Sequence, residues 1–311
     1  MVVGTLKWPL VKTIPDLTGK IALVTGANSS NGIGFHTAYQ LASHGAKVYI
    51  GARSDEKAGV AIHQMRTSNP AISADKLRPF IADLGDLKAV TSAAQTLLSE
   101  ESRLDILVHN AAILSMPVVL DSYGISVAFA TNHFGPFALT KALLPLLKKS
   151  AETNPGVRVV TVSAPAYKLL PPGIKFDSLA SFNIELEPTQ VGDAAFTRYG
   201  LSKLANLLFA RQLQKNFNKE GIKALSISLH PGLIKTDGTF KMVRPENQQT
   251  FAQRMSPPDG ALNTLFAATN PEVWEKKEEF GGAYLVPHGK IEEPIGNGAN
   301  DKLATELWET S

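Results

Sequence analysis

Residues 20–34 read KIALVTGANSSNGIG, a short apolar run followed by a loop with three glycines. The run, continuous to Thr25, is typical of a parallel strand buried on both faces. Gly26 permits a tight turn, Gly32 lets the backbone approach a bound phosphate, and Gly34 allows a helix to pack closely on the strand. The stretch therefore predicts a strand, a phosphate-binding loop and the N-terminus of a helix, where free N–H groups and the helix dipole favour an anion.

The rest of the chain alternates short β-rich runs with longer helical patterns. We expect strands at 20–25, 47–50, 77–81, 104–109, 158–162, 224–229 and 283–286, and helices at 33–43, 55–66, 86–98, 122–149 and 199–217. This alternation predicts an α/β fold, a doubly wound parallel sheet of about seven strands with helices on both faces.

Because nearly the whole chain contributes to this sheet, we expect residues 1–311 to form a single domain. Residues 1–18 would form an N-terminal arm. Residues 165–196 and 235–257 look like insertions on the substrate side, beyond the carboxyl ends of the strands.

The composition excludes several classes of protein. The 311 residues carry a net charge of +3 and contain no block of five or more Lys or Arg, so we expect no nucleic-acid partner. The absence of cysteine agrees with a cytoplasmic protein, and the seven histidines form no ligand cluster, so we expect no metal. No window approaches eighteen uncharged apolar residues, which argues against a membrane span.

Tyr199 and Lys203 stand four residues apart in the stretch YGLSK, and a helix would place them on one face. A nearby ammonium favours the phenolate, so we expect the pKa of Tyr199 to fall below its free value of about 10. A tyrosine tuned in this way can exchange a proton with a carbonyl or alcohol oxygen. The pair predicts an acid/base site.

The residue after the second strand distinguishes two nicotinamide cofactors. An acid there would accept hydrogen bonds from a ribose 2′-hydroxyl, whereas an arginine suits a 2′-phosphate. Here Arg53 follows the strand and no acid appears until Asp55. We therefore expect NADP(H) rather than NAD(H).

The chain resembles the short-chain dehydrogenase/reductase family over residues 20–284, because several motifs occur in the family's order. They are the glycine loop, Asp83-Leu84, Asn110-Ala111-Ala112, Asn132, Ser163, Tyr199-x-x-Ser202-Lys203 and Pro231-Gly232-x-x-x-Thr236. Arg53 and the stretch NHFG at 132–135 resemble most the NADP-using retinol-dehydrogenase and WW-domain-oxidoreductase-like branch. That branch often carries a membrane anchor, which we do not expect here. The resemblance implies a Rossmann-type fold and nicotinamide-dependent oxidoreduction.

The resemblance also implies roles for the matching positions. Tyr199 would be the general acid/base, Lys203 would hold the nicotinamide ribose and lower the tyrosine pKa, and Asn132 would position a water in a proton relay. Ser163 is the fourth catalytic candidate. The implied cofactor-binding residues are Gly26, Asn28, Ser29, Ser30, Asn31, Gly32, Ile33, Gly34, Arg53, Asp83, Leu84, Asn110, Ala111, Tyr199, Lys203, Pro231, Gly232, Ile234 and Thr236. Among them Asp83 would contact the adenine, Asn110 would support the cofactor ribose, and Thr236 would bind the carboxamide.

The chain departs from the family pattern in the glycine loop. Five residues separate Gly26 from Gly32, two more than is usual. We expect the extra residues to bulge near the adenosine phosphate, with Ser29, Ser30 or Asn31 in reach of a phosphate.

The second departure concerns the substrate oxygen. The family commonly ends its fifth strand with two serines, the second of which bonds the reacting oxygen, but here Ala164 follows Ser163. Three interpretations stay open. Ser163 serves through a shifted register, another donor such as Tyr167 replaces the serine, or the enzyme is weakened, naturally or by engineering.

Apolar residues surround the expected substrate position. The segment 166–196, together with Leu114 and Met116, would wall a pocket for a hydrophobic ketone, aldehyde or alcohol of terpenoid, steroid, lipid-like or aromatic character. Alternatively, 166–196 packs on the surface, where it would cover a helix face used for oligomerisation, so both a monomer and a homodimer are consistent.

Three functions compete. The leading hypothesis is an NADP(H)-dependent carbonyl reductase or alcohol dehydrogenase, such as those of secondary metabolism. A sugar-nucleotide epimerase would need a larger C-terminal domain than the chain after Thr236 provides. An NADP(H)-binding sensor or scaffold with weak or no turnover is the alternative from another class.

Overall fold

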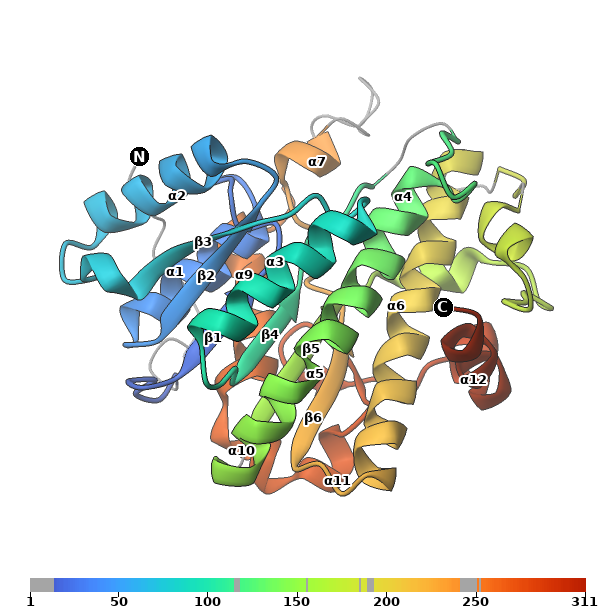
Figure 1. The fold of residues 1–311 in the computed structure, drawn as a ribbon. Helices are drawn as coiled ribbons and strands as arrows, with labels where there is room; N and C mark the ends of the chain where they lie inside the picture. The colour runs from blue at the N-terminus through green and yellow to red at the C-terminus, as the bar shows by residue number, and fades with distance from the viewer. Residues whose placement is uncertain are drawn as a thin grey trace.

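The computed structural model describes residues 14–114, 118–154, 156–184, 186–188, 193–240, 251 and 253–311. Its strands form one sheet, in the order β3-β2-β1-β4-β5-β6-β7-β8 (Figure 1). The strands are β1 (Ile21–Val24), β2 (Lys47–Ala52), β3 (Leu77–Ile81), β4 (Ile106–His109), β5 (Val157–Val162), β6 (Ala224–Leu229), β7 (Tyr284–Val286) and β8 (Lys290–Ile291). β1 to β7 are parallel, which confirms the expected doubly wound α/β fold.

β8 is the strand that the sequence pattern did not predict, so the expected sheet of about seven strands has eight. It pairs antiparallel with β7, Leu285 opposite Ile291 and Val286 opposite Lys290. The connection includes Gly289 at φ +72°, a conformation that favours glycine. Two exposed residues at a sheet edge show no apolar alternation, so a strand of this length leaves no periodic signal.

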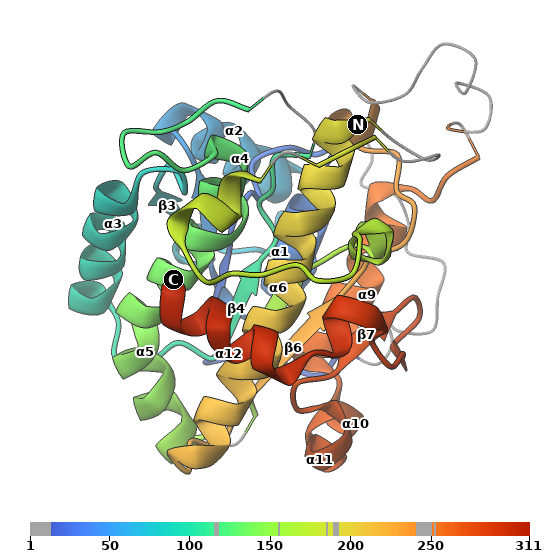
Figure 2. The same cartoon turned by 90° about the vertical axis from the view of Figure 1, so that its right-hand side faces the viewer.

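The helices cover both faces of the sheet (Figure 1; Figure 2). They are α1 (Ile33–Ser43), α2 (Asp55–Ser68), α3 (Leu87–Glu100), α4 (Val127–Phe129), α5 (Gly135–Thr153), α6 (Ala194–Lys219), α7 (Asp237–Phe240), α9 (Pro257–Thr269), α10 (Pro271–Glu275), α11 (Lys277–Phe280) and α12 (Asp301–Thr310). A π-helical segment, η3 (Ala130–Phe134), joins α4 to α5, and short 3-10 turns lie at η2 (Ala74–Lys76), η4 (Pro165–Leu169), η5 (Leu179–Asn183) and η7 (Gly296–Ala299).

β1 shows why the central strands read as continuous apolar runs. Ala22 and Val24 belong to a core cluster shared with α1 and α9, whereas Ile21 and Leu23 belong to the cluster shared with α3 and α5. Alternate side chains thus bury opposite faces of the sheet, so both sets of side chains in β1 are apolar. The carboxyl ends of β1 and β4, from which the chain winds in opposite directions, form the switch point where ligands bind in such folds.

Two helices differ from their expected bounds. The helix expected over 122–149 begins at Val127 and contains the π-helical segment η3 before α5, which ends at Thr153. α6 begins at Ala194 rather than Tyr199, because the Asp193 side chain accepts a hydrogen bond from the Phe196 N–H and caps the helix.

In the described part of the segment 165–196, most large apolar side chains pack into the protein, although Leu179 is exposed. Tyr167, Phe176 and Phe182 are buried in a cluster shared with α6 and α12. Figure 2 shows this segment and α12 lying across α6. Of its described residues, Pro165 alone reaches the cavity described below, so the expected apolar wall is not built from the described part of 166–196.

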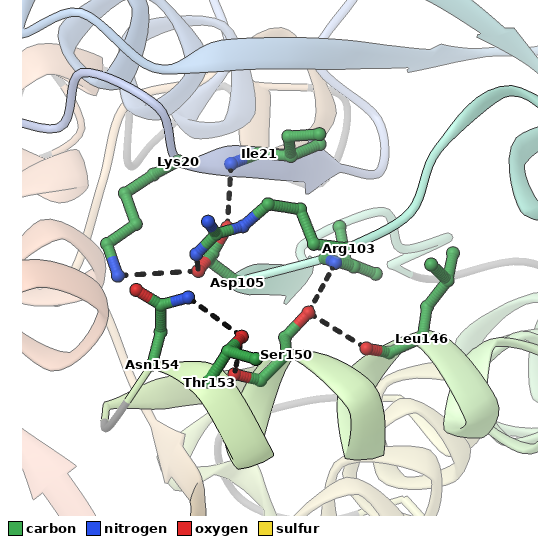
Figure 3. Close-up of polar contacts among 9 residues, drawn as sticks. Lys20, Ile21, Arg103, Asp105, Leu146, Ser150, Thr153 and Asn154 are labelled. Carbon is green, nitrogen blue, oxygen red and sulfur yellow. Dashed lines mark hydrogen bonds and ion pairs between the residues drawn. The ribbon is translucent and has the colours of Figure 1, made fainter.

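Polar contacts stabilise the amino ends of β1 and β4, at the end of the sheet away from the switch point (Figure 3). The buried carboxylate of Asp105 accepts hydrogen bonds from the Ile21 N–H at 2.9 Å and from the Arg103 Nε at 2.8 Å. Lys20 Nζ lies 3.4 Å from the same carboxylate. Nearby, Ser150 Oγ accepts from the Leu104 N–H at 2.7 Å and ties α5 to the start of β4.

Candidate active site

A cavity of about 460 Å³ opens at the carboxyl ends of the parallel strands. Its walls come from the loops after β1 to β6 and from one face of α6. The expected site residues that line it are Gly26, Asn28, Ser29, Asn31, Gly32, Ile33, Arg53, Asp83, Leu84, Asn110, Ala111, Ser163, Tyr199, Lys203, Pro231, Gly232, Ile234 and Thr236. Three expected site residues, Ser30, Gly34 and Asn132, do not line it.

The glycine loop packs tightly on the loop after β4. Gly26 has φ +64°, and a Cβ there would lie 2.8 Å from the Ala111 Cα. A Cβ on Gly34 would lie 2.6 Å from the Gly26 carbonyl oxygen and would also collide with the Asn110 amide. That amide donates to the Thr25 carbonyl oxygen at 2.9 Å. Gly34 and Asn110 thus set the shape of the loop, and the N-terminus of α1 faces the cavity.

The two extra residues of this loop are anchored on both sides. The Ser30 carbonyl oxygen lies 2.9 Å from His36 Nε2, so Ser30 is held against α1 rather than against the cavity. The Ser29 hydroxyl donates to the Asp237 carboxylate at 3.1 Å. The loop therefore reaches the segment after β6, a contact that the expected bulge near the adenosine phosphate did not include.

Lys203 is a buried cation at the floor of the cavity, 1% exposed. Its Nζ donates to the Val162 carbonyl oxygen at 2.8 Å and lies 5.5 Å from the centroid of the Tyr199 ring. Burial lowers the pKa of Lys203 to about 7. No carboxylate among the described residues pairs with it.

The pKa of Tyr199 differs from expectation. Burial raises it above its ordinary value, whereas the spacing of Tyr199 and Lys203 predicted a fall. The physical reason is that burial disfavours charge on both groups, so a desolvated Lys203 offers less charge to stabilise a phenolate. The two side chains are as close as the spacing predicted, but burial leaves Lys203 less charged than the prediction assumed.

Asn132 connects two elements instead of facing the cavity. Its Oδ1 accepts from the Ile113 N–H at 2.7 Å, and its Nδ2 donates to the Ile113 carbonyl oxygen at 2.8 Å and to Ser202 Oγ at 2.9 Å. Both amide hydrogens are thus used. Ser202 Oγ donates in turn to the Tyr199 carbonyl oxygen at 2.8 Å, so Asn132 positions the loop after β4 relative to α6.

The end of β5 shows which residue occupies the expected second-serine position. The Ser163 hydroxyl donates to the Lys203 carbonyl oxygen at 2.7 Å and is 1% exposed. Ala164 follows it on the cavity wall. The suggested replacement, Tyr167, is buried beside Tyr284, and its hydroxyl accepts from the Ile295 N–H at 3.4 Å, away from the lining. Neither hydroxyl replaces the absent serine in this geometry.

The loop after β6 forms the far wall. Thr236 and Thr239 cap one another: Thr239 Oγ1 accepts from the Thr236 N–H at 2.8 Å, and Thr236 Oγ1 accepts from the Thr239 N–H at 3.2 Å. His230 accepts from the Gly232 N–H at 3.1 Å, and His109 lies 2.7 Å from Thr140 Oγ1. Both histidines hold strand ends.

The comparisons with known proteins agree with this site. A family model described as short chain dehydrogenase matches residues 20–172. The chain is 40% identical to the short chain dehydrogenase/reductase dpchH of Colletotrichum higginsianum, over 95% of this chain and 74% of that protein. This chain belongs to the short-chain dehydrogenase/reductase family. It is also 35% identical to human retinol dehydrogenase 14, over 94% of this chain and 85% of that protein.

Solved structures place the fold in the same family. A Pseudomonas aeruginosa RhlG/NADP active-site complex superposes with a TM-score of 0.66 at 26% identity, over 91% of this chain and 98% of that one. Members of the family are oxidoreductases that bind a nicotinamide cofactor. Among the helices that the structure describes, none has the length and apolarity needed to cross a membrane.

The residues present fit such a cofactor. A lysine has three N–H donors, and Val162 accepts one of those of Lys203, which leaves two for ribose hydroxyls in the cavity. At the other end of the cavity, Gly32 precedes α1 and supplies no side-chain cap. The first N–H groups of α1 are therefore free for phosphate oxygens.

Several lining residues were not predicted from the sequence. They include Phe80, Ile113, Val127 and Thr131, whereas Pro165, Asp237, Gly238 and Thr239 fall in the segments 165–196 and 235–257 that were expected on the substrate side. Asp237 directly follows the expected Thr236, so adjacency was an available signal. Leu114 lines the cavity as expected, whereas Met116 lies outside the described residues.

Proposed function

We propose that the protein is an NADP(H)-dependent oxidoreductase that interconverts a ketone or aldehyde and an alcohol on a hydrophobic small molecule. The observation that carries the proposal is the position of Tyr199 and Lys203 on one wall of the cavity. Lys203 is buried with no carboxylate partner among the described residues, and Tyr199 stands one turn away. A buried lysine beside a phenol on a cavity wall supports acid/base chemistry more than a structural role.

The preference for NADP(H) is supported by the cavity wall after β2. Arg53 is exposed and lines the cavity, and the first acid beyond it, Asp55, begins α2. A guanidinium suits a ribose 2′-phosphate, and a carboxylate at this position would repel it. The RhlG structure, which is an NADP complex, is consistent with this choice.

In the proposed mechanism the cofactor, when bound, supplies or accepts the hydride. Lys203 would hold ribose hydroxyls through the Nζ donors that Val162 does not use, and those acceptors would favour its charged form. A charged Lys203 then stabilises negative charge on the Tyr199 oxygen. Tyr199 donates a proton to the substrate oxygen during reduction and removes it during oxidation. Asn132 and Ser202 hold α6 in the required register.

The apolar lining supports a hydrophobic substrate. Leu114, Val127, Ala164 and Pro165 are in the lining. Such walls favour terpenoid, steroid, lipid-like or aromatic compounds with few charged groups. The whole chain acts as one catalytic domain in this proposal.

One observation favours a second candidate, an NADP(H)-binding sensor or scaffold with weak or no turnover. Ala164 carries no hydroxyl, and the hydroxyls of Ser163 and Tyr167 are engaged elsewhere. A site that holds the substrate oxygen through Tyr199 alone would be slow.

Nicotinamide absorbance distinguishes the two candidates. The purified protein is mixed with NADPH or NADH and a panel of hydrophobic ketones, and with NADP⁺ or NAD⁺ and the matching alcohols. Tyr199→Phe is the control, since it keeps the ring and removes the proton. Turnover in the wild type that Tyr199→Phe abolishes supports the enzyme. Tight NADPH binding without turnover on any compound supports the sensor, and no binding of either cofactor refutes both.

A further inference from the structure

One side-chain contact joins opposite walls of the cavity. The Ser29 hydroxyl, in the loop after β1, donates to the Asp237 carboxylate at 3.1 Å, although the two residues are 208 positions apart. Both residues line the cavity. Asp237 begins α7, which lies above the carboxyl ends of the strands in Figure 1. The contact therefore lies on the cavity wall near the N-terminus of α1.

The position of Ser29 brings this contact close to the proposed phosphate site. The Ser29 carbonyl oxygen accepts from the Gly32 N–H at 2.8 Å, and Gly32 directly precedes α1. A diphosphate on the free N–H groups of α1 would therefore lie within about one residue's length of Ser29. Lys203, buried and with two unused donors, independently indicates a ligand in the same cavity.

Asp237 opposes an anionic ligand in two ways. A serine hydroxyl has a single hydrogen to donate, so Ser29 cannot donate fully to both the carboxylate and a phosphate oxygen. The carboxylate also repels the phosphate charge directly. No lysine or arginine among the described residues forms an ion pair with Asp237 that would neutralise it.

We propose that Asp237 competes with the cofactor diphosphate for the Ser29 hydroxyl, and that this competition weakens cofactor binding and speeds cofactor release. The proposal rests on the proposed function, because it takes a phosphate-bearing dinucleotide as the ligand. Asp237 then helps to set the affinity for the cofactor. The lengthened glycine loop also has a role, because it supplies Ser29, which contacts Asp237.

The test is the affinity and release rate of NADPH in Asp237→Asn, measured by nucleotide fluorescence at equilibrium and after rapid mixing. Asparagine keeps the shape of the side chain, removes the charge, and leaves only a weaker, neutral acceptor from which a phosphate can take the Ser29 hydroxyl. One unit charge a few ångströms beyond the diphosphate predicts about three- to tenfold tighter binding, mainly through slower release. Asp177→Asn, at an exposed acid outside the cavity lining, makes the same change in net charge and is expected to bind as the wild type does.

A double-mutant cycle tests the shared hydroxyl. The gain from Asp237→Asn should be at least about twofold larger when Ser29 is present than in Ser29→Ala, since only then is there a hydroxyl to release. Equal gains in the two backgrounds would overturn the competition. Unchanged or weaker binding in Asp237→Asn would overturn it as well, and would indicate that the contact is a latch that retains the cofactor. If the wild type binds NADPH and Asp237→Asn is no tighter, this inference alone fails. If the wild type binds no NADPH, the proposed function fails first.

Discussion

Restoring a hydroxyl at position 164 tests the proposed chemistry most directly. Ala164 has φ −157° and ψ 153°, an extended conformation that serine adopts without strain. Ala164 is on the cavity wall, and the Lys203 carbonyl oxygen already accepts from the Ser163 hydroxyl. A hydroxyl added at 164 is therefore free to face the cavity and the substrate oxygen.

The expected gain follows from the value of one oxyanion donor. Removing such a donor typically costs about 10²–10³ in turnover. The described residues around Ala164 make no contacts that would orient a serine hydroxyl. We therefore expect Ala164→Ser to raise kcat by about 10- to 100-fold, which is less than the full value of one donor. KM should change little, because the new hydrogen bond strengthens as charge develops on the oxygen.

The assay is steady-state turnover of NADPH with the best ketone from the panel. Tyr167→Phe is the matched control, and it should keep the wild-type rate because the Tyr167 hydroxyl is bonded to the Ile295 N–H. A kcat for Ala164→Ser at or below the wild-type value would refute the reasoning. It would show that another group already holds the substrate oxygen.

Three further predictions follow from single contacts. Arg53→Ser should weaken NADPH by about tenfold or more and leave NADH nearly unchanged, as competing titrations would show, because a charge-assisted hydrogen bond is worth about 1.5–3 kcal/mol. Asp105→Asn should lower the free energy of unfolding by about 1.5–3 kcal/mol in urea denaturation, because it removes the charge of a buried carboxylate that accepts from the partly exposed Arg103. The pKa of Lys203 is lowered to about 7 in the folded protein, against about 10.4 unfolded, so the unfolded state binds more protons between these values. The cofactor-free protein should therefore gain stability as pH rises from 7 to 10, a slope that Lys203→Met removes and that a flat wild-type profile would contradict.

The sequence predicted the central sheet well because parallel strands leave a strong signal. β1, β4 and β5 are buried on both faces, so each is mostly apolar, although β4 ends in His109 and β5 includes Arg158 and Thr161. The glycine loop was equally readable, since the collision of a Cβ at Gly34 with the Gly26 carbonyl oxygen leaves no alternative residue. These features depend on local geometry, which a sequence expresses directly.

The features that the sequence did not predict depend on contacts between distant segments. Phe176 and Phe182 are as apolar as pocket-wall residues, but apolarity does not distinguish a cavity wall from a core, and both side chains pack against α6 and α12. From the sequence, Ser30 was as good a phosphate ligand as Ser29. In the structure the Ser30 carbonyl oxygen lies 2.9 Å from His36 Nε2, which holds Ser30 against α1. The contact between Ser29 and Asp237 joins loops 208 residues apart, and no local pattern encodes it.

For the pair Tyr199 and Lys203, sequence spacing predicts the proximity of the side chains but not their pKa values. A separation of four residues correctly placed Lys203 within 5.5 Å of the Tyr199 ring, yet burial moves both pKa values toward the neutral forms. With a pKa of about 7, Lys203 is only partly charged near neutral pH and stabilises a phenolate weakly, so in the protein alone the pair is positioned but not fully charged. Acceptors that enter the cavity and bond the free Nζ donors favour the ammonium, and only then does the tyrosine pKa fall. In this reading the ligand that Lys203 binds also activates Tyr199, which makes proton transfer conditional on an occupied cavity.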